Sequence, residues 1–202
     1  MRAETAAAPG GARATGLLAA LAVTTLLASA CANDLVSASR SSTILVIERI
    51  GAVAGGSPDD PIDTFLNSDI SVILPDIGRV TTRLAFKSPG TSENPASPTS
   101  ANWVTITSYR VVYRRSDGRN EEGVDVPYRF EGGMTMTTSD IGSAEFTLVR
   151  AQAKLEEPLI LLRDGGGAVA ISVVAEITFY GHDQTGAEVS ADGTIGINFK
   201  DF

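Results

Sequence analysis

The chain has 202 residues, 43% of them apolar and 20% charged, a composition that excludes a disordered protein and predicts one domain with a hydrophobic core. Its net charge is −8, and residues 1–30 carry Arg2 and Arg13 against Glu4, so the remainder stands at −9. Such an acidic body repels phosphate backbones and argues against nucleic acid as a partner. The arginines that gather locally alternate with acidic residues and predict a solvated strand and turn; they are Arg110, Arg114, Arg115 and Arg119.

The first thirty residues have the pattern of a secretory signal peptide. A weakly basic, Ala-rich segment precedes a mainly apolar run of 14 residues from Leu17 to Ala30. This run is shorter than the roughly 20 residues that a permanent membrane-spanning helix needs. It ends in Leu27-Ala28-Ser29-Ala30-Cys31, which resembles the bacterial lipobox, although Ala28 stands where that motif prefers leucine. The resemblance implies cleavage between Ala30 and Cys31 and acyl chains on Cys31; the alternative is an ordinary signal peptide cleaved nearby, which leaves a free thiol.

Cys31 is the only cysteine, which excludes an intrachain disulfide and any multi-cysteine metal site. Two or three acyl chains on it would anchor the protein stably to a membrane, whereas one chain binds only marginally. The small, polar segment Ala32–Ser42 is typical of a flexible tether. We therefore expect a signal peptide at 1–30, a lipidated cysteine and tether at 31–42, and a β domain at 43–202. Ala32, with no aspartate after the cysteine, resembles lipoproteins sorted to the outer membrane on its periplasmic or surface side.

From Thr43 onward, short apolar runs are separated by Gly, Pro, Asn and Asp, a pattern typical of β-strands joined by turns. The clearest strand is Trp103–Arg115, whose apolar positions change parity near Thr107-Ser108 and so predict a bulge. Val124, Val126, Tyr128 and Phe130 alternate on the expected return strand. Further strands are expected at Thr43–Val53, Thr64–Leu74, Arg79–Lys87, Met134–Thr138, Ala144–Arg150, Val169–Tyr180 and Thr194–Phe199. Ala151–Glu157, closed by Pro158, is the only helical turn expected in this part.

Half-apolar strands must bury one face against a second sheet, so they predict an all-β fold: a single two-sheet sandwich of about seven to nine strands. The stretch ITSYRVVYRRSDG at 106–118 resembles the middle strand of fibronectin type III and related immunoglobulin-like domains. The stretch AEITFYGHDQTGAEVSADGTIGINF at 175–199 is similar to the final hairpin of a group of uncharacterised bacterial lipoproteins. These resemblances imply an immunoglobulin-like sandwich without the cysteine pair of antibody domains. They carry no assigned activity.

Candidate catalytic and ligand-binding residues are sparse. His182 is the only histidine, no G-x-S-x-G motif accompanies it, and its neighbours Gly181, Asp183 and Gln184 favour a hairpin turn over a catalytic base. The glycine run at 165–167 lacks the G-K-[ST] ending of a phosphate-binding loop. Two acidic groups lack the spacing of a calcium loop, which leaves calcium as a minor alternative to the expected absence of metals and cofactors. These groups are Asp59, Asp60 and Asp63, and Asp183, Glu188 and Asp192.

Five aromatic residues stand on or beside the expected strands: Trp103, Tyr109, Tyr113, Tyr128 and Tyr180. They would form a sugar-binding face if they pointed outward together, but tyrosines in strands usually pack against cross-strand neighbours, and we expect packing.

These features predict a lipid-anchored, non-enzymatic module for binding or assembly at the cell envelope, with an unidentified envelope protein as partner. The proline-rich loop Ser88–Asn102 is the expected contact surface, through Pro89, Asn94, Pro95 and Pro98. Two alternatives stay open at this point. One is an envelope carbohydrate-binding or carbohydrate-active protein with an unrecognised carboxylate or aromatic site, and the other is a structural subunit of a larger envelope complex.

Overall fold

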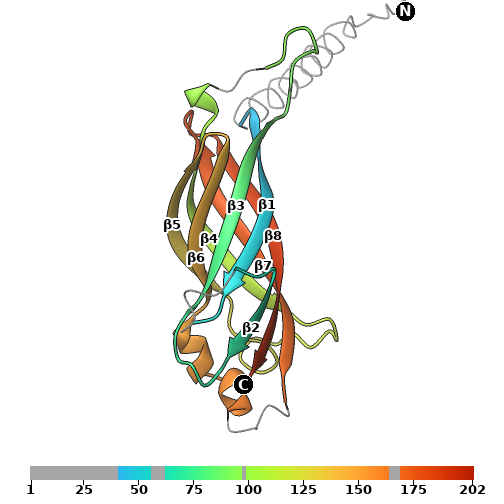
Figure 1. The fold of residues 1–202 in the computed structure, drawn as a ribbon, viewed down its shortest axis with the longest axis vertical. Coiled ribbons are helices and arrows are strands. Elements are labelled where there is room, and N and C mark those ends of the chain that lie inside the picture. Colours follow the sequence, from blue (N-terminus) through green and yellow to red (C-terminus); the bar gives the residue numbers. More distant parts are fainter. Residues whose placement is uncertain (1–40, 56–61, 97–98, 164–168) are drawn as a thin grey trace, which may run out of the picture. The chain divides into compact units, whose positions relative to one another are not determined.

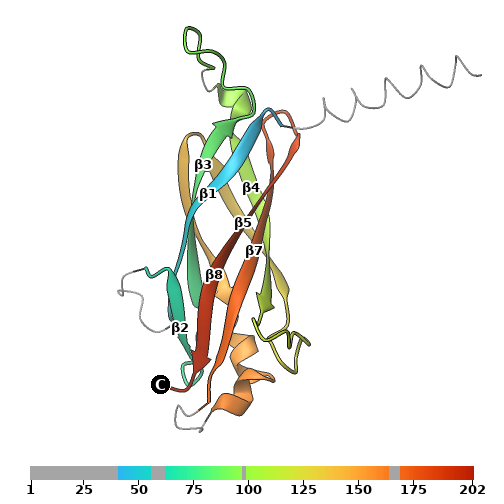
Figure 2. The same ribbon diagram turned by 90° about the vertical axis from the view of Figure 1, so that its right-hand side faces the viewer.

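A computed structural model describes residues 41–55, 62–96, 99–163 and 169–202. The expected signal peptide, Ala30, Cys31 and most of the tether lie outside these ranges, as do Asp59, Asp60, Pro98 and the glycine run at 165–167. Ser41–Phe202 forms one compact unit, and its described residues make eight strands in two facing sheets (Figures 1 and 2). No helix within the described ranges is long and apolar enough to cross a membrane.

The three-stranded sheet has the order β1-β3-β6 and the five-stranded sheet the order β2-β8-β7-β4-β5. Neighbouring strands are antiparallel except β2 and β8, which are parallel. In immunoglobulin lettering, β1, β3 and β6 correspond to A, B and E, and β4, β7 and β8 to C, F and G. The predicted all-β fold, a single two-sheet sandwich of seven to nine strands, is confirmed. The strands are β1 Thr43–Val53, β2 Phe65–Asp69, β3 Asp76–Phe86, β4 Val104–Arg114, β5 Phe130–Thr138, β6 Ile141–Val149, β7 Ile171–Asp183 and β8 Glu188–Lys200.

The core lies between the sheets because alternate side chains of each strand point inward. In β7 and β8 the expected parity is the buried one, with Ile177, Phe179 and Ile197 at most 1% exposed. Tyr109 of β4, Phe146 of β6 and Phe179 of β7 form a ring cluster with centroid distances of 5.1 Å and 5.3 Å around Phe146. This cluster joins the two sheets through edge-to-face contacts, the arrangement that aromatic quadrupoles favour.

The bulge predicted in β4 is confirmed. The register shifts between Ile106 and Ser108 against both neighbouring strands, β5 and β7. Ile106 before the shift and Tyr109 and Val111 after it are all buried. The extra residue therefore lets one strand keep its apolar side chains in the core although their spacing changes parity.

The predicted strand through Val124, Val126 and Tyr128 is wrong. These residues lie in a loop, in which the carbonyl of Glu121 accepts hydrogen bonds from the amides of residues 124, 125 and 126 at 2.8–3.3 Å. Gly123 turns the chain with a φ of 80°, and buried Pro127 has no amide to give to a ladder. The return strand β5 begins only at Phe130 and continues through the segment expected as a separate strand at 134–138.

Within the described ranges, three short 3₁₀-helices accompany the strands: η1 Ser100–Asn102, η2 Ala151–Leu155 and η3 Leu159–Leu162. The expectation of a single helical turn was thus too low, although its position at 151–157 matches η2. We call the end of the sandwich that holds Ser41–Thr43, the 88–102 loop and the β5–β6 and β7–β8 turns the Ser41 end. The opposite end holds the 115–129 loop, the β2–β3 connection, η2, η3 and Phe202 (Figure 1).

Candidate functional site

The first described residues are fastened to both ends of the 88–102 loop. Lys87 donates its side-chain Nζ to the carbonyl of Ser41 at 2.7 Å and its backbone amide to the carbonyl of Ser42 at 3.0 Å. Asn102, at the far end of the loop, donates Nδ2 to the hydroxyl of Ser42 at 2.9 Å. The first described residues and the expected contact loop therefore lie together at the Ser41 end, and these hydrogen bonds hold Ser41 and Ser42 beside the loop.

The expected contact residues Pro89, Asn94 and Pro95 are exposed on this loop, and Pro98 lies outside the described residues. The loop is more ordered than its composition indicates. Gly90, with a φ of 81°, and Pro95 form an isolated bridge, and the amide of Asn94 donates to the hydroxyl of Thr91 at 3.0 Å. These contacts make a small closed turn that presents prolines and amide groups to solvent.

Asp183 organises the β7–β8 turn from a buried position. Its Oδ1 accepts hydrogen bonds from the amide and hydroxyl of Thr185, at 2.8 Å and 2.6 Å, and from the amide of Ala187 at 3.0 Å. Burial alone would raise the pKa of Asp183, but hydrogen bonds from Thr185, Ser41 and Ala187 outweigh it and hold the pKa below its ordinary value. The carboxylate is thus occupied within the fold and also connects the turn to the first residue of the domain.

The acidic group proposed as a calcium alternative is not assembled. Asp183 is buried, whereas Glu188 and Asp192 are exposed on β8. In the strand register they lie opposite His182 and Thr178 of β7. In the first acidic group only Asp63 is described, and it forms a bridge with Ala52. Across the described ranges no three Asp, Glu, His or Cys side chains lie close enough to share a metal ion.

His182 is the last residue but one of β7 and lies just before the turn rather than within it. Its Nδ1 is 3.1 Å from the carbonyl of Asp183, and since a carbonyl only accepts, Nδ1 carries the proton. Its neighbours in register are Glu188 of β8 and Thr105 of β4. The ring is exposed at the edge of the turn.

The five aromatic residues do not form a common platform. Tyr109 and Tyr113 are buried, and their hydroxyls serve the edge strand β6: the amide of Thr147 donates to Tyr109 Oη at 3.1 Å, and Tyr113 Oη donates to the carbonyl of Leu148 at 2.8 Å. Burial raises the pKa of Tyr113 above its ordinary value. Trp103 is exposed at the Ser41 end, Tyr128 at the opposite end, and Tyr180 lies under the guanidinium of Arg110.

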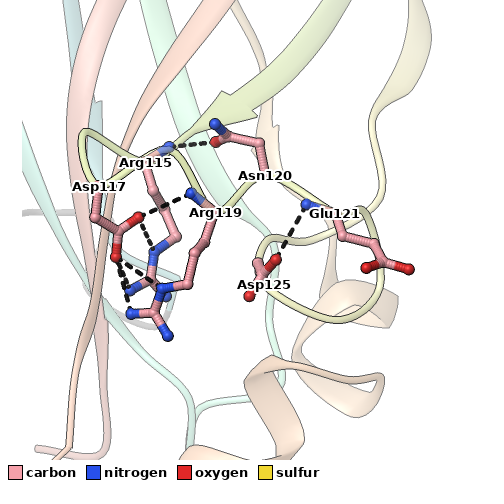
Figure 3. A network of polar contacts seen from close by, with 6 residues as sticks. All are labelled: Arg115, Asp117, Arg119, Asn120, Glu121 and Asp125. Atoms are coloured by element: carbon pink, nitrogen blue, oxygen red, sulfur yellow. Dashed lines mark hydrogen bonds and ion pairs between the residues drawn. The ribbon is translucent and has the colours of Figure 1, made fainter.

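The arginine-rich turn is a compact ion-pair network (Figure 3). Arg115 and Arg119 both donate to Asp117, with their closest contacts at 2.6 Å and 2.8 Å. The hydrogen bonds from Arg115 and then Arg119 hold the pKa of Asp117 well below its ordinary value. Oδ1 of Asn120 accepts a hydrogen bond of 2.7 Å from the backbone amide of Arg115. Because the arginines are engaged with this carboxylate, the network supports the interpretation as a solvated turn.

One buried polar cluster was not predicted from the sequence. Lys154 of η2 and Asp76 of β3 are both fully buried and form an ion pair of 2.8 Å between Nζ and Oδ1. The two residues are 78 positions apart in the sequence, so no local pattern connects them. The cluster lies at the opposite end of the sandwich and joins η2 to the start of β3.

Exposed large apolar side chains occur mainly around the opposite end. Among the described large apolar side chains, that of Leu161 on η3 is the most exposed, at 69%. The other exposed apolar or aromatic side chains described there are Phe65, Ile73, Leu74, Val124, Tyr128, Leu155, Ile160, Val169 and Phe202. Comparison with models of known protein families and with characterised proteins gives no match to this chain.

Proposed function

We propose that the protein is a lipid-anchored component of a bacterial cell envelope whose immunoglobulin-like sandwich serves as a non-enzymatic binding or assembly module. One observation carries the proposal: the compact unit begins at Ser41, ten residues after the only cysteine, and that cysteine closes a lipobox-like segment. Acyl chains on Cys31 give this unpaired thiol a role and hold the sandwich within a few nanometres of a membrane. The binding role is supported by exposed loops on a sandwich scaffold.

The anchor is tested by replacing the thiol. In bacteria that process lipoproteins, Cys31→Ser should abolish labelling by a palmitate analogue and move the protein from the membrane to the soluble fraction. Ser29→Ala is the matched control, since a small residue is retained in the lipobox-like segment and labelling should persist. Persistent labelling and membrane association of Cys31→Ser would show that Cys31 is not the anchor.

The binding role is tested on the 88–102 loop. An affinity-tagged protein should recover one envelope protein in fixed stoichiometry, and Glu93→Lys in the exposed turn should lower that recovery without changing the melting temperature. Asp192→Lys, an equally drastic charge reversal on the exposed face of β8, is the control and should leave recovery unchanged. Equal recovery with both variants would remove the loop as the contact surface.

The enzymatic alternative has a direct test. Turnover of an ester or glycoside panel that disappears in His182→Ala would overturn the non-enzymatic proposal.

The carbohydrate-binding alternative is tested on Trp103 and Tyr128, the two well-exposed aromatic residues of the five. Binding of an envelope glycan that is lost on Trp103→Ala or Tyr128→Ala would favour this alternative.

A further inference from the structure

The buried ion pair at the opposite end has unusual surroundings for two charges. Lys154 Nζ donates to Asp76 Oδ1 at 2.8 Å and to the carbonyl of Val72 at 3.1 Å. Asp76 also accepts the amide of Gly55 on Oδ1 at 2.7 Å and the hydroxyl of Ser68 on Oδ2 at 2.6 Å. Both charged side chains are 0% exposed, and desolvating two charges is costly even when they are paired.

The hydrogen-bond partners around Lys154 Nζ suit an amide nitrogen, joined to the side chain of Asp76, better than they suit an ammonium ion. An ammonium has three hydrogens, and the described residues supply two acceptors for them, Asp76 Oδ1 and the carbonyl of Val72. A secondary amide between the two side chains would have one N–H group. The carbonyl of Val72 is placed to accept a hydrogen bond from it. Its carbonyl oxygen, the former Oδ1, would keep the hydrogen bond from Gly55.

We propose that Lys154 and Asp76 condense to an intramolecular amide, an isopeptide bond between the side chains. Proton transfer from the ammonium to the carboxylate gives a neutral amine beside a neutral acid, which removes the cost of two buried charges. The nitrogen of Lys154 then forms a bond to Cγ of Asp76, and the bond from Cγ to Oδ2 breaks. The departing oxygen takes two of the three ammonium hydrogens and leaves as water, so the reaction needs no oxidant or other reactant.

Ser68 is the positioning residue of this step. Its hydroxyl donates to Oδ2, the oxygen that departs, and Ser68 itself is fully buried. A hydroxyl in this position passes a proton to the leaving oxygen and takes one back from the attacking nitrogen. The resulting bond would close a loop between β3 and η2 in a chain that has no disulfide, and such a cross-link restricts the unfolded state.

The test is the mass of the denatured protein. Wild-type protein should be lighter than its sequence by one water molecule, and a proteolytic digest should contain one branched peptide that joins the Lys154 and Asp76 segments. Lys154→Arg keeps the charge and the ion pair but cannot condense in this way, so it should have the full mass. Ser68→Ala should condense more slowly, measured as the fraction of branched peptide against time after synthesis.

The digest also separates the proposal from another loss of water. Asp117-Gly118, Asp164-Gly165 and Asp192-Gly193 can form succinimides, which have the same mass deficit. A deficit that maps to one of these dipeptides, or that persists in Lys154→Arg, overturns the proposal. A wild-type chain of full mass with no branched peptide overturns it equally and leaves an ion pair only. Because mass is read on denatured protein, a variant that fails to fold still gives an answer.

Discussion

At the scale of single residues, burial decides what a charged side chain does, and burial is the property that local sequence shows least. Lys154 stands in the stretch AQAKLEEP, whose polar composition indicates an exposed turn, yet its side chain is fully buried against Asp76. Asp183 stands in a Gly-rich turn that was expected from the sequence, yet its carboxylate points inward and holds that turn together. Neither carboxylate could be told from the exposed Asp117 or Asp192 before the tertiary fold was known.

Removing the buried nitrogen of Lys154, the partner of Asp76, should destabilise the domain strongly. Lys154→Met leaves Asp76 buried without its partner, and we expect a loss of about 3–5 kcal/mol in the free energy of unfolding by urea denaturation. Arg79→Met is the control, because the Arg79–Glu145 pair is exposed on both sides and its loss should cost less than about 1 kcal/mol. Similar losses for the two variants would contradict the importance assigned to the buried pair.

Asp183 should make the stability depend on acid pH. Its pKa in the folded protein lies below the ordinary value, so its stabilising contribution is complete above about pH 3.9 and is lost as the pH falls through the lowered pKa. Asp183→Asn should therefore be less stable than wild type at pH 7, and the two unfolding curves should converge as the pH is lowered toward 2. A constant difference between them over this range would rule out the ionised carboxylate as the source.

At the scale of elements, strands were predictable where the apolar period is clear and both ends of the strand are paired. β1 has the predicted bounds, and the β4 bulge was visible as a change of parity. The alternation through Val124 and Tyr128 was just as clear, but pairing of β4 with β5 ends at the pair Val111–Phe130, and the described residues supply no partner strand for it. Alternation reports which side chains prefer burial; whether a neighbouring strand is present depends on the chain as a whole.

The close contact between β4 and β5 gives a matched pair of glycine substitutions. A Cβ at Gly132 would lie 2.4 Å from the ring of Tyr109, a core residue that also bonds β6, whereas a Cβ at Gly133 meets nothing within 4 Å. Gly132→Ala should lower the free energy of unfolding by about 1–3 kcal/mol because the ring must move. Gly133→Ala should be neutral or slightly stabilising. Equal effects in thermal or urea unfolding would contradict this packing.

At the scale of the whole molecule, the all-β class and the two-sheet architecture followed from composition and period, because half-apolar strands have few other ways to bury one face. The strand order could not be read in this way, since it depends on contacts between segments far apart in the chain, such as parallel β2 against β8. The same holds for the Ser41 end, where the first residues, the 88–102 loop and the β7–β8 turn meet. The contacts show that Ser41 and Ser42, which the sequence assigned to the tether, are bound to the sandwich.

The fastening of the first residues predicts a sharp limit to truncation. A chain that begins at Arg40 should unfold at the same urea concentration as one that begins at Cys31, because the core of the described domain lies within Ser41–Phe202. A chain that begins at Ile44 loses the acceptors of Lys87 and Asn102 and the buried Ser41 and Thr43, and we expect it to lose about 2–4 kcal/mol. If the chain that begins at Ile44 were as stable as the one that begins at Arg40, the hydrogen bonds at the Ser41 end would not contribute to the stability of the sandwich.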